Sequence, residues 1–154
     1  MKNFTVFFIG LLFIGGLVFG QEAQTEKKPN TAVTLGFLQG GGSLVGVDFE
    51  HLVSDRISLQ VGVGIIGLGA AINYHLKPSI SSSMISLLYW HQGIGNTFTQ
   101  SLLGPSFVFR AKKLFTASLG LGFALAQGPA WPKDKIDQPP VMLTYSIGIY
   151  LPVK

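Results

Sequence analysis

Apolar and polar residues alternate along most of the chain that follows residue 30. The alternation is clearest over 57–65, where Ile, Leu and Val occupy every second position and Ser, Gln and Gly stand between them. It recurs in three further segments: 68–76, 115–125 and 143–151. A period of two predicts β-strands, because successive side chains of a strand point to opposite faces. Four less regular segments bring the predicted strands to eight: 31–39, 44–52, 83–91 and 101–110.

The connections between these strands alternate in character. Those after the second, fourth and sixth strands are short and charged, centred on 54–56, 77–79 and 111–113. The others are 39–43, 64–69, 92–100 and 127–140, of which the last two are the longest. Strands of about 9 to 11 residues cross a bilayer at a tilt of about 45°, and an even number closes with both termini on one side. The pattern therefore predicts an all-β fold over 31–154, an eight-stranded antiparallel up-and-down transmembrane β-barrel.

Composition decides which face of the predicted barrel points outward. The chain is 47% hydrophobic and only 12% charged, whereas about 25% of the residues in an ordinary soluble domain are charged. The second face of the strands is built from Gly, Ala, Ser and Thr, which suit the narrow interior of an eight-stranded barrel. We therefore expect the large apolar face to contact lipid. The alternative is a soluble secreted barrel that turns its large residues inward and binds an apolar ligand.

Aromatic residues on the predicted outward face gather near both ends of the strands. They lie near the charged turns at Phe49, Tyr74, Phe109 and Phe115, and near the longer loops at Phe37, Tyr89 and Phe123. Aromatic side chains are enriched at the two membrane–water interfaces. This placement predicts two aromatic girdles.

The N-terminal segment has the features of a secretory signal peptide. Lys2 precedes an apolar run over 4–20, and the small residues Val18 and Gly20 are spaced as at a cleavage site. We expect residues 1–20 to be removed near Gly20 and the polar segment 21–30 to serve as a linker. The alternative is a transmembrane helix, for which this run is at the lower limit of length.

In strand number, alternation, turn pattern and signal peptide, residues 31–154 resemble the small outer-membrane β-barrel proteins of Gram-negative bacteria, the OmpA/OmpX-like group. The resemblance implies an outer-membrane location and two partners, the lipid of that membrane and the barrel-assembly machinery. The chain departs from the group at its C-terminus, where such barrels usually end on an aromatic residue. Here the nearest aromatic residue is Tyr150.

Several inward-facing polar residues are predicted to meet inside the barrel. Glu50, His75, Arg110 and Tyr150 fall near the turn ends of four strands, and Asp48 lies one layer further in. Buried charges need partners, because unpaired burial costs several kcal/mol. We expect a polar plug in which Arg110 pairs with Glu50 and Asp48, while His75 and Tyr150 complete the hydrogen bonds. A structural role is favoured over a proton path or a ligand site, and the narrow lumen argues against a general porin.

A second constellation lies near the outer rim. If the fifth and sixth strands form a hairpin that turns near residue 96, His91 falls opposite Ser101 on the outward face. A His beside a Ser is the arrangement of a base and a nucleophile, and it resembles the lipid A deacylase barrels. The His-x-Ser-Asn pattern of those enzymes is absent, and no outward carboxylate stands near His91. A lipid-modifying enzyme is therefore the alternative to an interfacial histidine with no catalytic role.

The sequence contains no convincing signal for a cofactor, a metal ion or a nucleic acid. Gly62 to Gly67 matches a dinucleotide-binding pattern, but another strand follows it instead of a helix. The chain has no Cys, its three His residues share no face, and its 11 Lys and Arg are scattered. We therefore expect no cofactor, no metal site and no nucleic-acid partner. The Pro-rich loop 127–140 with Trp131 is either a surface for a partner or a cap on the barrel. The sequence thus predicts a non-enzymatic outer-membrane barrel with a structural or surface-interaction role.

Overall fold

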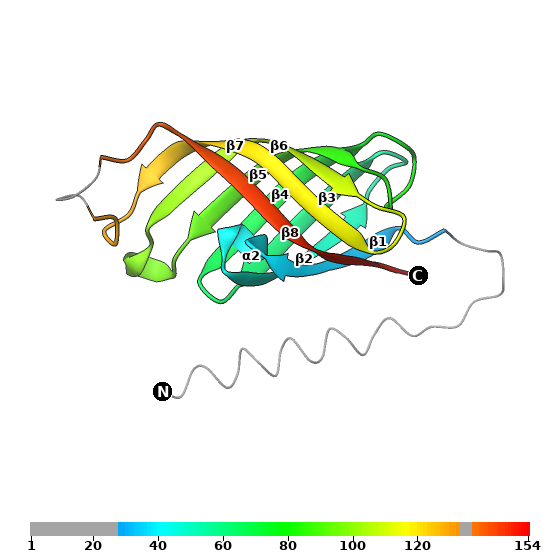
Figure 1. Ribbon diagram of the computed structural model, residues 1–154, viewed down its shortest axis with the longest axis horizontal. Helices are drawn as coiled ribbons and strands as arrows, with labels where there is room; N and C mark the ends of the chain where they lie inside the picture. Colours follow the sequence, from blue (N-terminus) through cyan, green and yellow to red (C-terminus); the bar gives the residue numbers. More distant parts are fainter. Residues whose placement is uncertain (1–27, 133–136) are drawn as a thin grey trace, which may run out of the picture.

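The chain from Thr31 to Val153 forms a closed barrel in which each strand pairs antiparallel with the next and β1 pairs with β8 (Figure 1). The computed structural model describes residues 28–132 and 137–154. It confirms the predicted all-β, eight-stranded up-and-down barrel. The predicted signal peptide and most of the linker lie outside the described residues. Among the described residues, no helix is both long and apolar enough to cross a membrane.

All the predicted strands are present, with small changes at their ends. Their bounds are β1 Thr31–Phe37, β2 Val45–Leu52, β3 Ile57–Gly64, β4 Gly67–His75, β5 Met84–Gln92, β6 Gln100–Arg110, β7 Phe115–Gln127 and β8 Val141–Val153. Two short turns are labelled α2 (Gln39–Gly42) and η1 (Gly95–Thr97). The connection between β3 and β4 is tighter than predicted, because Gly64 pairs directly with Gly67. β7 and β8 are longer than predicted and shorten the last loop.

Burial along the strands follows the predicted alternation, with small and polar residues inside and large apolar residues outside. In β3, the outward Val61 is 60% exposed, whereas the inward Ser58 is 0% exposed. The same contrast holds in β8, where Thr144, Ser146 and Tyr150 are buried and the apolar residues between them are exposed. Polar side chains therefore occupy the interior of this barrel, and its exposed surface is largely apolar.

The two ends of the barrel differ in their connections (Figure 1). At the turn end lie the start of β1, the end of β8 and the three turns 53–56, 76–83 and 111–114. At the loop end lie the other four connections, including α2 and the segment between β7 and β8. This division is the one that the sequence predicts, and it sets the level at which each inward side chain lies.

Candidate functional site

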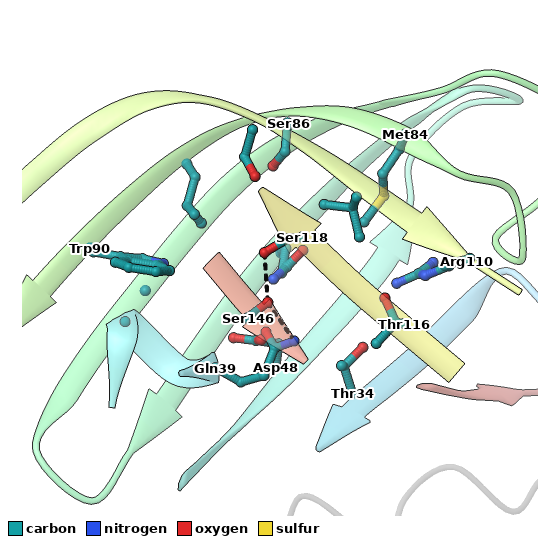
Figure 2. Close-up of a pocket in the computed structure, with 16 residues that line it drawn as sticks. Thr34, Gln39, Asp48, Met84, Ser86, Trp90, Arg110, Thr116, Ser118 and Ser146 are labelled. Carbon is teal, nitrogen blue, oxygen red and sulfur yellow. Dashed lines mark hydrogen bonds between the residues drawn. The ribbon is translucent and has the colours of Figure 1, made fainter. Parts of the chain in front are cut away.

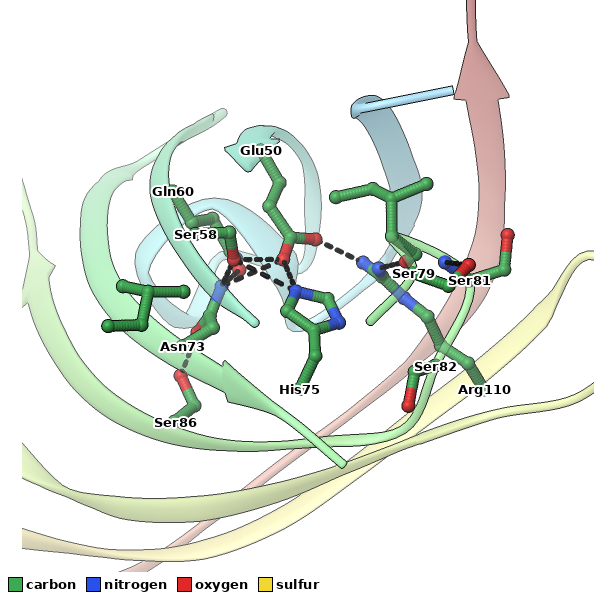
Figure 3. A network of polar contacts seen from close by, with 12 residues as sticks. Glu50, Ser58, Gln60, Asn73, His75, Ser79, Ser81, Ser82, Ser86 and Arg110 are labelled. Atoms are coloured by element: carbon green, nitrogen blue, oxygen red, sulfur yellow. Dashed lines mark hydrogen bonds and ion pairs between the residues drawn. The ribbon is translucent and has the colours of Figure 1, made fainter. Parts of the chain in front are cut away.

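Glu50 is the centre of a buried polar network at the turn end of the lumen (Figure 3). It projects inward from β2 and is 1% exposed. Its Oε2 accepts a hydrogen bond of 2.5 Å from Nη2 of Arg110 on β6, which forms an ion pair across the barrel. Its Oε1 accepts a hydrogen bond of 2.5 Å from the Ser58 hydroxyl and lies 2.9 Å from Nε2 of His75. The structure thus brings together three of the residues expected in the plug.

The network extends through residues that the sequence analysis did not single out. Asn73 donates from Nδ2 to Glu50 Oε1 at 3.1 Å and to Gln60 Oε1 at 3.1 Å. Its own Oδ1 accepts a hydrogen bond of 2.5 Å from the Ser86 hydroxyl. All of these side chains have inward parity, which the alternating pattern already indicates. Parity shows that Asn73 faces the lumen, but it does not show that this amide links β2, β3 and β5.

Arg110 also hydrogen-bonds the turn between β4 and β5 and holds it at the end of the barrel. Its Nη1 donates to the backbone carbonyl of Ile80, which is fully buried, and its backbone N–H donates to the Ser83 hydroxyl at 3.1 Å. The guanidinium carbon lies 4.8 Å from the centre of the Tyr150 ring, while the Tyr150 hydroxyl donates to the Ala111 carbonyl at 2.8 Å. Tyr150 therefore supports Arg110 through its ring and holds the backbone through its hydroxyl. The turn 76–83, with the buried Ile80, therefore closes the lumen at the turn end.

Asp48 has a different partner from the predicted one. Its Oδ1 accepts a hydrogen bond of 3.1 Å from the backbone N–H of Gly40, whereas the ion pair of Arg110 is with Glu50. The reason is that α2 folds into the lumen at the loop end and presents its backbone to β2. Gln39 of α2 reaches the Ser146 hydroxyl at 3.1 Å, and Gln92 donates to the Gly42 carbonyl at 3.1 Å. The first loop is therefore a second closure of the barrel.

Glycine makes this inward turn possible. Gly40 and Gly41 are buried with φ of 61° and 83°, the left-handed region in which a side chain is strained. A Cβ atom on either residue would also collide with the backbone, at the carbonyls of Val63 and Leu68 respectively. A residue with a side chain would not fit between the strands at these two positions, and glycine therefore allows the loop to lie inside the barrel.

Between the two closures lies a small internal cavity of about 30 Å³ (Figure 2). Asp48, Ser106 and Arg110 line it, together with Trp90 and Met84. The described residues leave Asp48 Oδ2 and Ser106 Oγ without a hydrogen-bond partner. The volume is that of about two water molecules at most, so the cavity is far too small for an apolar ligand. The lumen is a packed polar core closed at both ends.

The aromatic residues of the predicted girdles all lie on strands with outward parity. Six of them are exposed, namely Phe37, Phe49, Tyr74, Phe109, Phe115 and Phe123, and Tyr89 is half-buried. Phe109 and Phe115 contact each other at the turn end with ring centres 6.5 Å apart. Their assignment to membrane interfaces stays a prediction.

His91 and Ser101 lie opposite each other on β5 and β6, as expected from the hairpin. The Nδ1 atom of His91 is 2.8 Å from the Ser101 hydroxyl, and the Phe98 ring lies 4.9 Å from the imidazole. Ser101 is buried, at 6% exposure. No carboxylate of the described residues hydrogen-bonds His91, so this part of the chain supplies no acidic group to orient the imidazole. The geometry is that of a base and a nucleophile without a complete triad.

The other two histidines have different surroundings from His91. His51 is exposed on the outward face of β2, with its Nδ1 2.9 Å from the Thr31 hydroxyl, while His75 is buried in the lumen. No cluster of three or more His, Cys, Asp or Glu residues with the spacing of a metal site occurs within 28–132 and 137–154.

The segment after β7 interlocks with the loop between β5 and β6. Gly128 donates its backbone N–H to the Thr99 carbonyl at 2.8 Å, and Ala130 donates to the Phe98 carbonyl at 3.2 Å. Trp131 is half-buried near the end of the first described part of the loop, and residues 133–136 lie outside the described range. The beginning of the 127–140 loop is therefore held against the barrel rim.

A comparison of this chain with protein-family models, with curated proteins and with solved structures finds no match. The function therefore has to be inferred from the barrel itself, its exposed apolar surface and its closed polar interior.

Proposed function

We propose that this protein is an integral outer-membrane β-barrel of the OmpA/OmpX-like kind, exported by a cleaved signal peptide, with a structural or surface-interaction role. The observation that carries the proposal is the inverted burial of the strands. Leu, Ile, Val and Phe side chains on all eight strands are exposed, whereas Asp48, Glu50 and Arg110 are buried. Soluble monomers rarely expose an apolar patch of more than a few hundred Å². A bilayer is the environment in which such a surface is stable, since the closed strand ladder leaves no backbone edge unpaired.

The closed interior favours a barrel without transport activity. The turn containing Ile80 fills one end, α2 fills the other, and the ion pair between Glu50 and Arg110 crosses the space between them. Eight-stranded barrels have interiors just wide enough for side chains, so no continuous water path is expected. The same packing argues against the soluble barrel with an apolar ligand inside.

The role that remains is at the surface. With the termini in the periplasm, the loop end faces outward, and the loop 127–140 with Trp131 is the surface through which a partner would bind. Outer-membrane lipid and the barrel-assembly machinery are the other expected partners. No nucleic-acid partner or cofactor is part of the proposal.

A liposome-swelling assay tests the closed lumen. The mature chain, refolded into liposomes, is predicted to admit small sugars no faster than protein-free liposomes do. The control is a general porin, refolded in the same lipid, which gives rapid swelling. Swelling at the porin's rate by the wild-type chain would contradict a non-transporting role.

The hydrogen bond between His91 and Ser101 supports a second candidate, a lipid-modifying enzyme. Ser101→Ala tests this candidate, because the substitution removes the nucleophile that such an enzyme needs. If the protein is an enzyme, cells that express the variant should have the same membrane lipids as cells without the protein. We expect instead that the wild-type and Ser101→Ala chains leave the same lipid profile by mass spectrometry. A difference between the two profiles that depends on Ser101 would overturn the non-enzymatic proposal.

A further inference from the structure

Within residues 28–132 and 137–154, the charged residues on the outside of the barrel are concentrated at the turn end. Four exposed cations lie in the three turns, namely Arg56, Lys77, Lys112 and Lys113, and Asp55 is the carboxylate among them. We call these four cations the basic collar. At the loop end, Asp137 is the one charged residue among those that the structure describes. The surface charge of the described barrel is therefore positive and one-sided.

No carboxylate of the described residues forms an ion pair with a collar cation. The ion pair that Arg110 forms with Glu50 lies inside the lumen, away from the collar. Arg56 is held at the barrel wall, where its Nη1 lies 3.5 Å from the Tyr74 hydroxyl and donates to the Leu76 carbonyl at 3.4 Å. A fixed cation beside an exposed aromatic ring is placed where an apolar surface meets a charged one.

Lys77 and Lys112 share one hollow at this end. It has a volume of about 540 Å³ and lies between the β4–β5 turn, the β6–β7 turn and the end of β8. Ser81 and Ser83 add hydroxyl groups to its lining, and Leu76 and Leu114 add exposed apolar side chains. The hollow thus combines two cations and hydrogen-bond donors with an apolar border. This is the chemistry that complements a phosphate group attached to a hydrocarbon chain.

We propose that the basic collar binds the headgroup phosphates of anionic phospholipids in the leaflet that the turn end faces, with the hollow at Lys77 and Lys112 as its strongest site. The inference rests on the proposed membrane function, because it needs the collar to lie at the level of the headgroups. Beyond that function, the inference names the class of lipid that the protein binds selectively. A Lys or Arg near an anionic membrane surface strengthens binding about five-fold.

The experiment uses the mature full-length chain in phosphatidylcholine vesicles that contain a trace of spin-labelled phosphatidylglycerol or spin-labelled phosphatidylcholine. Electron paramagnetic resonance measures the fraction of each labelled lipid that the protein immobilises. We expect phosphatidylglycerol to associate at least about five-fold more strongly than phosphatidylcholine, and added salt to weaken the preference. Inorganic phosphate, compared with chloride at equal ionic strength, is expected not to compete.

Charge variants assign the preference to the hollow. Lys77→Gln with Lys112→Gln is expected to abolish most of it, while Lys77→Arg with Lys112→Arg retains it. The matched control, Lys133→Gln with Lys135→Gln, removes the same charge from the connection between β7 and β8 and is expected to retain the preference. An equal loss in the control, an unselective wild type or competition by inorganic phosphate would each overturn the lipid site while leaving the membrane barrel intact. Failure of the wild type to enter vesicles would overturn both proposals.

Discussion

Replacing Arg110 with Met is expected to lower the free energy of unfolding of the barrel by about 3–5 kcal/mol. The substitution keeps much of the side-chain volume but removes the cation that pairs with Glu50 at 2.5 Å. Glu50 is then left as a buried carboxylate, and the Ile80 carbonyl loses its donor. Ser58 and Asn73 still donate hydrogen bonds to Glu50, but neutral hydrogen bonds do not replace the charge.

Urea unfolding of the refolded protein, followed by tryptophan fluorescence, measures this loss. Two variants serve as controls. Arg56→Met removes an exposed arginine at the same end and is expected to change stability by less than about 0.5 kcal/mol. Glu50→Gln combined with Arg110→Met removes both charges and is expected to recover part of the stability. Unfolding of Arg110→Met at the wild-type urea concentration would show that the ion pair does not support the barrel.

Lysine at Val61 is expected to destabilise the membrane-inserted barrel by about 2–4 kcal/mol. Val61 lies in the middle of β3, pairs with Phe49 and Ala70 on its neighbours, and is 60% exposed on the outward face. At this level the lysine ammonium group would enter the hydrocarbon core of the bilayer. Leu121→Lys, midway along β7, is expected to have a similar effect because Leu121 has the same outward parity.

The matched control is Leu76→Lys, which places the same charge on the outward face beside the turn end, where the cost falls to about 0–1 kcal/mol. Equilibrium unfolding in lipid vesicles gives the difference between the two positions. A barrel surrounded by water would tolerate an exposed lysine at Val61 as well as at Leu76, within about 0.5 kcal/mol. Equal stability of the two variants would therefore contradict the lipid-facing assignment of the apolar surface.

The strand positions and the side of each residue were predictable because strand geometry leaves a period of two in the sequence. That period placed Glu50, His75 and Arg110 inside the same barrel. The register of the hairpin formed by β5 and β6 was also predictable, because a turn near residue 96 places His91 opposite Ser101, as observed. The local pattern thus predicts the fold and the neighbours within a hairpin.

The closures of the lumen were not predictable, because a loop that leaves the sheet carries no period. Nothing in the run of glycines in α2 indicates whether it extends into solvent or folds inward. Its inward path depends on the space between strands that are far apart in the sequence, and it gives Asp48 a backbone partner in place of Arg110. The buried position of Ile80 depends in the same way on Arg110, thirty residues further along the chain. Such contacts between distant segments follow from the assembled barrel.

Membrane fractionation followed by gel mobility with and without boiling tests the central claim most directly. A closed outer-membrane barrel is predicted to sediment with the membranes, to need detergent for extraction, and to migrate differently before and after boiling, because the closed strand ladder resists detergent until it is heated. A protein that stays in solution without detergent and shows no change of mobility on boiling would contradict the membrane barrel.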